Sequence, residues 1–157
     1  MAAKRKGEGQ ISVNRRARFD YEITETVEAG LVLLGTEVKS LRGGKVSLAE
    51  AFATIRRGEA WLMQATIPEY EYGNRMNHDP TRPRKLLVHR REIAAMETFT
   101  QEQGRTLVPM QLYWKDGRVK LLVGMGTGKS NYDKRHAMAD RDAAREVQRA
   151  LRERQRS

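Results

Sequence analysis

Two alternating apolar segments joined by an Asp–Gly turn constrain this fold most. Leu107 to Trp114 and Val119 to Met125 have the two-residue period of half-buried strands, and they flank Lys115-Asp116-Gly117-Arg118. Asp–Gly between alternating segments favours a primed turn, which joins neighbouring antiparallel strands. The sequence therefore predicts a β-hairpin here and an antiparallel sheet as the base of the fold.

Other segments add strands and short helices to this hairpin. Alternating side chains and turn residues mark the strands, whereas capping residues and helical spacing mark the helices. The predicted elements are strands at 19–24 and 31–34 on either side of Gly30, a hairpin over 51–67 around Arg57-Gly58, a long loop at 68–85, and short helices at 36–42, 47–50 and 90–103.

This pattern predicts one small barrel with two extensions. About six mostly antiparallel strands and a few short helices favour a mainly β fold, an OB-like antiparallel barrel over residues 14–128. The chain has 157 residues and 39% hydrophobic content, enough for one modest core. Residues 1–13 lack an apolar pattern and predict a disordered basic arm, and residues 129–157 form a basic C-terminal tail.

Basic residues are concentrated in three parts of the chain. The sequence has 30 Lys and Arg against 20 Asp and Glu, a formal net charge of +10 at pH 7. Residues 1–18 hold six basic residues and one acid, residues 75–91 six and one, and residues 128–157 nine and five. Such a field attracts polyanions, foremost nucleic acid. No apolar run approaches the roughly 18 residues of a spanning helix, and residues 1–10 lack a signal peptide's apolar stretch. We expect a monomeric, cytoplasmic protein with no membrane partner.

The sequence offers no recognisable catalytic or metal-binding set. It contains no cysteine, and His78, His89 and His136 lack metal-ligand spacing, so we expect no metal, no cofactor and no enzyme. Gly124-Met125-Gly126-Thr127-Gly128-Lys129-Ser130 has the composition of a P-loop, but its glycines are too close together for that pattern. These glycines are expected either to permit close approach of RNA phosphates or to form a flexible exit from the last strand.

The tail combines a basic stripe with a weak apolar seam. The stripe comprises Arg141, Arg145, Arg149, Arg152 and Arg156, and the seam comprises Ala143, Ala144, Val147, Ala150 and Leu151. Like charges at this spacing each disfavour an isolated helix by about 0.2–0.5 kcal/mol. We therefore expect a tail that is disordered when free and helical when bound in a phosphate-lined channel. The alternative is an ordinary solvated helix with incidental arginines.

Four stretches, in order and at matching spacing, resemble the SmpB family (SsrA-binding proteins), the partners of transfer-messenger RNA in trans-translation. The resemblance covers the chain from Asn14 to Arg135. The stretches are Asn14 to Tyr21; Gly35 to Arg42; Gly73-Asn74 through Asn77 to Pro80 and on to Arg84-Lys85-Leu86-Leu87; and Gly128-Lys129 through Tyr132 to Arg135.

The resemblance implies an RNA-binding adaptor of ribosome rescue. Its OB-like barrel would bind the tRNA-like domain of transfer-messenger RNA and deliver it to stalled ribosomes. The tail would occupy the empty mRNA channel of the small subunit, with Tyr132 stacking on a decoding-centre base. The ribosome-binding residues of the tail would be Tyr132, Asp133, Lys134, Arg135, Arg141, Arg145 and Arg149.

RNA contacts of the barrel are predicted mainly on its basic residues. Arg15, Arg16 and Arg18 suit phosphates, and Phe19 suits base stacking if it points outward, with inward packing as the alternative. Glu37 is predicted to accept a hydrogen bond from a base or to orient a neighbouring cation, the alternative being a surface ion pair. The full predicted set is Asn14, Arg15, Arg16, Arg18, Phe19, Glu37, Lys39, Ser40, Arg42, Lys45, Arg82, Arg84, Lys85 and Lys129.

The chain departs from the family pattern at several positions. Members often have histidine in place of Phe19, and basic residues in place of Thr127 and Ser130. Many have bulkier side chains than the alanines of the tail seam. Two other classes remain as alternatives: a generic OB-type, ribosome-associated RNA chaperone, and an RNA-processing enzyme, for which the sequence offers no nucleophile–base pair or acid cluster.

Overall fold

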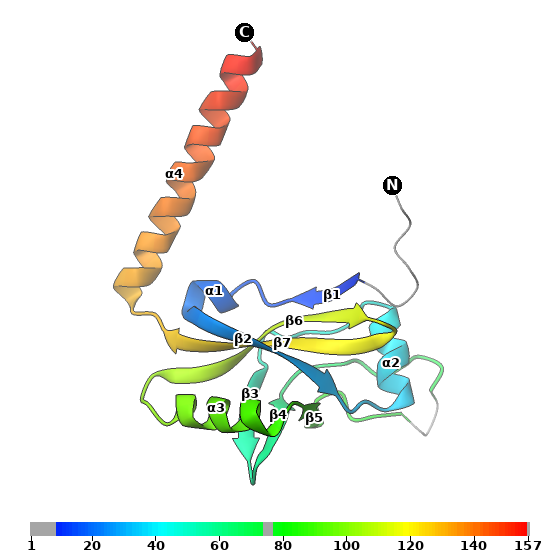
Figure 1. The fold of residues 1–157 in the computed structure, drawn as a ribbon. Coiled ribbons are helices and arrows are strands. Elements are labelled where there is room, and N and C mark those ends of the chain that lie inside the picture. The colour runs from blue at the N-terminus through cyan, green and yellow to red at the C-terminus, as the bar shows by residue number, and fades with distance from the viewer. Residues whose placement is uncertain (1–8, 74–76, 157) are drawn as a thin grey trace.

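The computed structural model describes residues 9–73 and 77–156, and their centre is a closed antiparallel β-barrel (Figure 1). Six of the described strands form the ring in the order β6, β3, β4, β5, β2, β7, and β7 pairs back to β6. The strands are β1 (Gly9–Val13), β2 (Tyr21–Leu31), β3 (Phe52–Arg56), β4 (Glu59–Met63), β5 (Arg84–Leu87), β6 (Arg105–Lys115) and β7 (Arg118–Gly128). This arrangement confirms the predicted mainly β, OB-like fold with short helices.

The β6–β7 hairpin is the longest ladder of the barrel and confirms the predicted turn. The two strands pair from Arg105 with Thr127 to Lys115 with Arg118. Asp116 and Gly117 have φ values of 52° and 74°, the left-handed conformations of a primed turn. Because β7 also pairs with β2 along most of its length, this hairpin supplies the wall to which the other strands attach.

Several predicted elements differ in the structure. Phe19 lies in the short helix α1 (Ala17–Asp20) rather than in a strand. Gly30 lies within β2, where it pairs with Leu87 of β5 and Lys120 of β7, so the predicted break is absent and 31–34 is no second strand. The predicted helical turn at 47–50 is instead an isolated bridge between Ser47 and Thr66.

Strand β1 corrects the predicted disordered arm over its last five residues. It pairs with residues 111–114 of β6, beyond the point where β3 joins the same strand. Ile11 packs against the main core. An edge of β6 that β3 leaves open thus orders residues 9–13, whereas residues 1–8 lie outside the described part of the chain.

Three longer helices lie outside the barrel. They are α2 (Gly35–Arg42), α3 (Arg90–Thr100) and α4 (Asn131–Arg156), and the first two confirm predicted helices. Figure 1 shows α1 and the start of α4 at one end of the barrel and α2 at the other, with α4 extending away from the barrel. The described side chains of α4 are exposed. That the tail is disordered when free stays a prediction.

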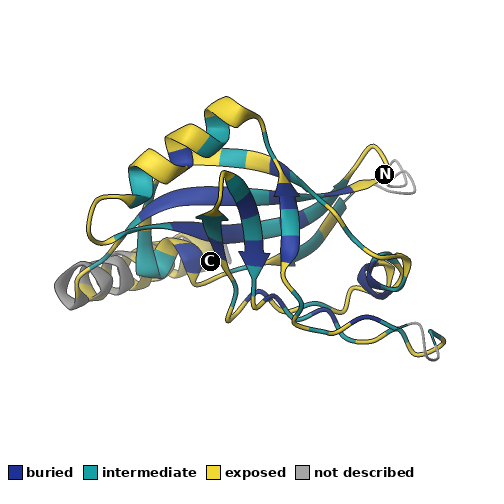
Figure 2. Ribbon diagram, turned by 90° about the horizontal axis from the view of Figure 1, so that it is seen from below, coloured by how far each residue is buried: buried dark blue, intermediate teal, exposed yellow. Residues whose placement is uncertain are grey.

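Apolar side chains fill the barrel, and Figure 2 shows that the buried residues lie mainly on its strands. The main core includes Leu41, Leu62, Ile67, Met96, Leu107, Leu112, Leu121 and Val123. A smaller cluster of Ala17, Val108 and Met110, flanked by Tyr21, Ile23 and Leu122, lies beneath α1. Because α1 contributes Ala17 to this cluster, its neighbouring polar residues are held at a fixed place on the barrel.

The glycine-rich segment after Val123 belongs to the barrel wall. Gly124 and Gly126 lie buried in β7, so the expected RNA approach or flexible exit is wrong for both. A Cβ added at Gly124 would lie 2.6 Å from Met110 Sδ, and one at Gly126 would lie 2.8 Å from Ile23 Cδ1. The missing side chains leave space for the cluster beneath α1.

Replacing Gly124 with alanine should therefore destabilise the barrel. We expect Gly124→Ala to lower the free energy of unfolding by about 1–3 kcal/mol, the usual cost of overpacking, in thermal or denaturant unfolding. Gly128→Ala is the matched control, because its nearest neighbour would be 3.8 Å away. Equal melting temperatures for the two variants would contradict this packing.

Candidate RNA-binding surfaces

A buried ion pair occupies the centre of the predicted site. The side chains of Glu37, in α2, and Arg84, in β5, are both 0% exposed, and Arg84 Nε lies 2.6 Å from Glu37 Oε2. Arg82, 25% exposed, donates to the other carboxylate oxygen, with Nε at 3.1 Å. Glu37 also accepts a hydrogen bond at 2.8 Å from the backbone N–H of Leu34, which caps the start of α2.

Arg84 satisfies its remaining donors on the backbone of the preceding loop. Its Nη1 donates to Ala65 O at 2.5 Å, and its Nη2 donates to Pro80 O at 3.0 Å. A fully buried arginine needs such partners, because desolvating an unpaired charge is very costly. The prediction that Arg84 is an RNA contact on an exposed loop is wrong. The prediction that Glu37 contacts a base is wrong as well. Its predicted alternative, that Glu37 orients a neighbouring cation, fits the contact between Glu37 and Arg82.

Further buried polar contacts fasten the same loop to α2. Ser40 is 5% exposed and donates to Pro68 O at 2.5 Å, so the prediction that Ser40 binds RNA is also wrong. His78, 3% exposed, lies 2.9 Å from Thr36 Oγ1 through Nδ1 and 2.7 Å from Ile67 O through Nε2. Together with the ion pair, these bonds fix the path of residues 65–73 and 77–84.

The Glu37 carboxyl remains ionised although it is buried. Desolvation raises its pKa, but hydrogen bonds from Arg82, Leu34 and Arg84 outweigh that cost and lower the pKa below the ordinary value of 4.5. Burial lowers the pKa of Arg84, and its hydrogen bond and charge attraction to Glu37 oppose that shift. The two groups thus stabilise each other in their charged forms.

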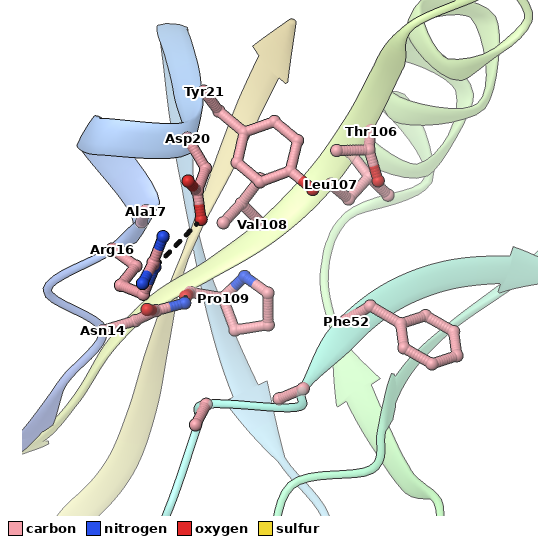
Figure 3. Close-up of a pocket in the computed structure, with 12 residues that line it drawn as sticks. Asn14, Arg16, Ala17, Asp20, Tyr21, Phe52, Thr106, Leu107, Val108 and Pro109 are labelled. Atoms are coloured by element: carbon pink, nitrogen blue, oxygen red, sulfur yellow. Dashed lines mark hydrogen bonds and ion pairs between the residues drawn. The ribbon is translucent and has the colours of Figure 1, made fainter. Parts of the chain in front are cut away.

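The α1 end of the barrel carries the exposed predicted residues. Arg15, Arg16 and Arg18 are all exposed, and Arg16 Nε lies 3.4 Å from Asp20 Oδ2, the dashed line in Figure 3. Phe19 is half-buried and lies outside both core clusters. We use the term α1 surface for Arg15, Arg16, Arg18 and Phe19 together with Lys129 and Arg141.

Phe19 contacts arginines from both the barrel end and the tail. The guanidinium groups of Arg16 and Arg141 each lie 5.6 Å from the centre of its ring. Lys129 Nζ donates to Arg18 O at 2.9 Å, and the Lys129 backbone N–H donates to Asp20 O at 2.8 Å. Lys129 therefore anchors the start of the tail on α1 as well as adding charge to this surface.

A cavity of about 200 Å³ lies beside α1 (Figure 3). Asn14, Arg16 and Asp20 line its α1 side, and Pro109 and Phe52 line it from β6 and β3. The Asn14 amide donates to Pro109 O at 3.0 Å, so it connects the residues before α1 to β6. RNA contact by Asn14 stays a prediction.

The predicted basic residues of α2 and β5 are only partly grouped. Arg42 and Lys45 are exposed at the end of α2, while Lys39 Nζ lies 5.5 Å from the ring centre of Tyr70. Lys85 is separated from them on the outer face of β5 and pairs with Glu59 at 3.1 Å. The predicted RNA-binding residues therefore do not form one continuous patch.

In the tail, Arg135, Arg141, Arg145 and Arg149 are exposed along α4. The side chains of Tyr132, Asp133 and Lys134 lie outside the described residues, and so do those of Arg154 and Arg156.

Sequence reasoning missed an apolar groove with a basic rim. Two adjoining hollows of about 530 and 650 Å³ share Gly30, Leu87 and Lys120, and Trp114 and Arg118 line the first. Leu87 is 53% exposed. The signal was the pair Leu86-Leu87, because only one of two adjacent strand residues can face the core. We call this surface the Leu87 groove.

Glu28 adds a fixed carboxylate to the groove. It lines the larger hollow. Hydrogen bonds from Tyr113 and Lys115 lower its pKa, and burial and the Glu28 bond raise the pKa of Tyr113. Glu28 is therefore an ionised acceptor at neutral pH, held in place at the edge of a basic surface.

Neither a membrane nor a metal site is indicated by the described residues. Within 9–73 and 77–156, no helix combines the length and apolar character needed to cross a membrane. The same part of the chain contains no group of three or more His, Asp or Glu side chains placed to hold a metal ion.

An OB-like barrel with a basic end, a basic tail and an apolar groove defines a class of RNA-binding proteins. The model of the SmpB protein family matches residues 11–153, and the chain belongs to this family.

Individual relatives agree over nearly the whole chain. An SsrA-binding protein of Thermobifida fusca (strain YX) is 56% identical over 159 residues, covering 98% of this chain and 99% of that protein. The SsrA-binding protein of Anoxybacillus flavithermus (strain DSM 21510 / WK1) is 58% identical over 151 residues, with 96% and 98% covered. A solved chain described as "tmRNA-SmpB: a journey to the center of the bacterial ribosome" has a TM-score of 0.65 and 45% identity, covering 80% of this chain and 87% of that one.

The Glu37 ion pair predicts a specific dependence of stability on pH. Because the folded pKa of Glu37 is lowered, its stabilisation is complete above about pH 4.5 and is lost as the pH falls through the folded pKa. We expect Glu37→Gln to lower the free energy of unfolding at pH 7 by about 3–5 kcal/mol, since Arg84 loses its buried partner. The deficit should shrink below about pH 4.5.

Thermal unfolding across pH 3 to 8 measures this effect. Glu50→Gln is the control, because Glu50 is exposed and has no ion pair in the described structure. If Glu37→Gln and Glu50→Gln melt alike at every pH, the carboxylate does not stabilise the fold.

Proposed function

We propose that this chain is an RNA-binding adaptor of trans-translation, which binds the tRNA-like domain of transfer-messenger RNA and delivers it to stalled ribosomes. The names of its relatives and the tmRNA–SmpB structure support this role. SmpB proteins are an RNA-binding family, and we propose no catalytic step and no cofactor. Its place of action is then the ribosome in the cytoplasm.

The observation that carries the proposal is the separation of two surfaces. The Leu87 groove offers apolar contact from Leu87 and Trp114, cations from Arg118 and Lys120, and an acceptor in Glu28. Such a mixture suits exposed bases and their phosphates in a folded RNA loop. We assign this groove to the tRNA-like domain.

The α1 surface and the tail are assigned to the small ribosomal subunit. Arg15, Arg16 and Arg18 lie at the barrel end from which α4 departs, and Arg141 of α4 contacts Phe19. Arginines on a helix that leaves the barrel suit an RNA-lined channel such as the empty mRNA path. By family resemblance, Tyr132 to Arg135 would lie at the decoding centre.

A generic OB-type RNA chaperone is the competing function. It would bind unrelated structured RNAs about as well as transfer-messenger RNA, whereas the adaptor prefers the latter. Competition binding at near-physiological salt separates the two, because at low salt phosphate contacts dominate any affinity. Equal competition by an unrelated structured RNA would overturn the adaptor role.

The groove assignment predicts a loss of affinity in Leu87→Ser. Complete burial of a leucine side chain contributes roughly 1.5–3 kcal/mol, and about half of that remains available to RNA because Leu87 is 53% exposed. The dissociation constant for transfer-messenger RNA should therefore rise about 4- to 10-fold. Leu151→Ser is the matched control, because Leu151 in the tail is also 53% exposed. Lys120→Ala should reduce the log–log salt slope by about 0.7–0.9. Unchanged affinity in both groove variants would place the RNA elsewhere.

The tail assignment predicts that binding and rescue separate. Truncation after Ser130 keeps the Lys129 contacts with α1, so RNA affinity should remain while rescue of stalled ribosomes is lost. Ala144→Pro should reproduce the loss, since proline costs about 3 kcal/mol inside a helix, and Ala144→Gln should not. Full rescue by the proline variant would exclude a helical tail as the active form.

A further inference from the structure

The outer face of strands β3, β4 and β5 carries aromatic and basic side chains. Their neighbours along the strands, among them Ala53, Leu62 and Leu86, are buried in the core, so the alternate residues face outward. Cross-strand pairing forms three outward rows. They are Phe52 with Met63, Thr54 with Trp61 and Lys85, and Arg56 with Glu59.

Trp61 lies at the centre of this face beside a groove. The groove has a volume of about 530 Å³ and is lined by Arg56, Arg57, Glu59, Trp61, Met63 and Pro83. Phe52 is the diagonal neighbour of Trp61 across the β3–β4 ladder and is 42% exposed. An outward aromatic pair on a sheet offers two flat surfaces for bases, and stacking of this kind tolerates any base.

The turn of the β3–β4 hairpin supports a role for its arginine. Arg57 and Gly58 have φ values of 51° and 74°, nearly the same as Asp116 and Gly117 in the other hairpin. Primed turns favour Asn, Asp or Gly at the first position, because other residues are strained at positive φ. Arg57 therefore occupies a turn position whose backbone conformation favours Asn, Asp or Gly, the position that Asp116 occupies in the other hairpin.

Charge on this face favours a polyanion over an apolar partner. In the described structure no ion pair involves Arg56 or Arg57, and Glu59 is paired with Lys85. The cations Arg56, Arg57 and Lys85 thus outnumber the single acid. Figure 1 shows the hairpin tip on the side of the barrel opposite α1 and α4.

We propose that the outer face of β3–β4–β5 binds an unpaired RNA strand, with Trp61 and Phe52 stacking on bases and Arg56 and Arg57 pairing with phosphates. This site adjoins the Leu87 groove, because Glu59 and Lys85 also line the larger hollow of that groove, whereas Arg56, Arg57 and Trp61 line neither of its hollows. Base stacking and phosphate pairing of this kind accept an unpaired RNA strand of any sequence. The site gives the adaptor a third contact, suited to single-stranded segments of either RNA partner.

Tryptophan fluorescence tests the stacking directly. The chain has two tryptophans, Trp61 and Trp114, so full-length Trp114→Phe reports on Trp61 alone. Titration with a short oligouridylate, which has no stable structure, should quench this emission. For the Trp61 variants, binding is followed on a fluorescently labelled oligouridylate instead: Trp61→Thr should weaken it about 5- to 150-fold, and Trp61→Phe should largely restore it, since stacking is lost and regained. Absence of quenching at saturating oligouridylate would overturn the proposal.

Replacing Arg56 and Arg57 tests the proposed phosphate pairing and keeps the side chains of Trp61 and Phe52. Arg56→Ala/Arg57→Ala should reduce the log–log salt slope for oligouridylate by about 1.4, which is roughly 0.7 for each single-strand phosphate. Arg90→Ala/Arg91→Ala removes two exposed arginines from α3 and should leave the slope less affected. If the salt slope fell equally in the two double variants, the change would reflect net charge alone, and the proposed site would be wrong.

Leu87→Ser distinguishes this site from the proposed function. It should impair transfer-messenger RNA binding and leave oligouridylate binding unchanged. If oligouridylate binding falls with Leu87→Ser and survives Arg56→Ala/Arg57→Ala, unpaired RNA occupies the groove, and the β3–β4–β5 site is wrong while the adaptor function stands.

Discussion

The ion pair between Glu37 and Arg84 is the contact on which the arrangement of this barrel depends. Two residues 47 positions apart bring together helix α2, strand β5 and the loop between β4 and β5, and neither partner is exposed to water. Removing one partner would leave an uncompensated buried charge, which costs several kcal/mol. The pair therefore fixes where α2 begins, where β5 joins the ring and where the described residues on either side of 74–76 lie against the barrel.

The four stretches that resemble the SmpB family therefore contain two groups of residues, one buried and structural and one exposed to solvent. Glu37, Ser40, His78 and Arg84 are buried polar residues whose separate bonds hold α2, β5 and the loop before β5 in place, and they are closed to RNA. Leu87 follows Arg84 by three positions in the same strand, and it faces outward at the groove. The ion pair thereby sets the position of the groove without contacting a ligand. Arg15, Arg16 and Arg18 belong to the second group, because a short helix over a small apolar cluster presents them to solvent.

Local signals in the sequence predicted much of the fold, and long-range contacts account for the rest. The β6–β7 and β3–β4 hairpins and helices α2 and α3 follow from turn chemistry and periodicity, which act over a few residues. The burial of Arg84 could not be predicted in this way, because an arginine beside prolines has the local signature of an exposed loop. Only its pairing with Glu37 offsets the free-energy cost of burying its charge. Strand β1 was missed for a similar reason, since residues 9–13 are ordered by an open edge of β6 that lies about 100 positions away.

A double-mutant cycle on Glu37 and Arg84, read out by both stability and RNA affinity, tests this account most directly. Glu37→Gln, Arg84→Gln and the double variant would be compared with the parent chain in chemical unfolding, and in binding to the tRNA-like domain at a temperature where all four are folded. We predict a coupling energy of about 0.5–3 kcal/mol in the free energy of unfolding and, for the folded variants, dissociation constants indistinguishable from that of the parent. A folded Glu37→Gln variant with unchanged stability and a tenfold loss of RNA affinity would contradict it, because Glu37 would then act on RNA rather than on the barrel.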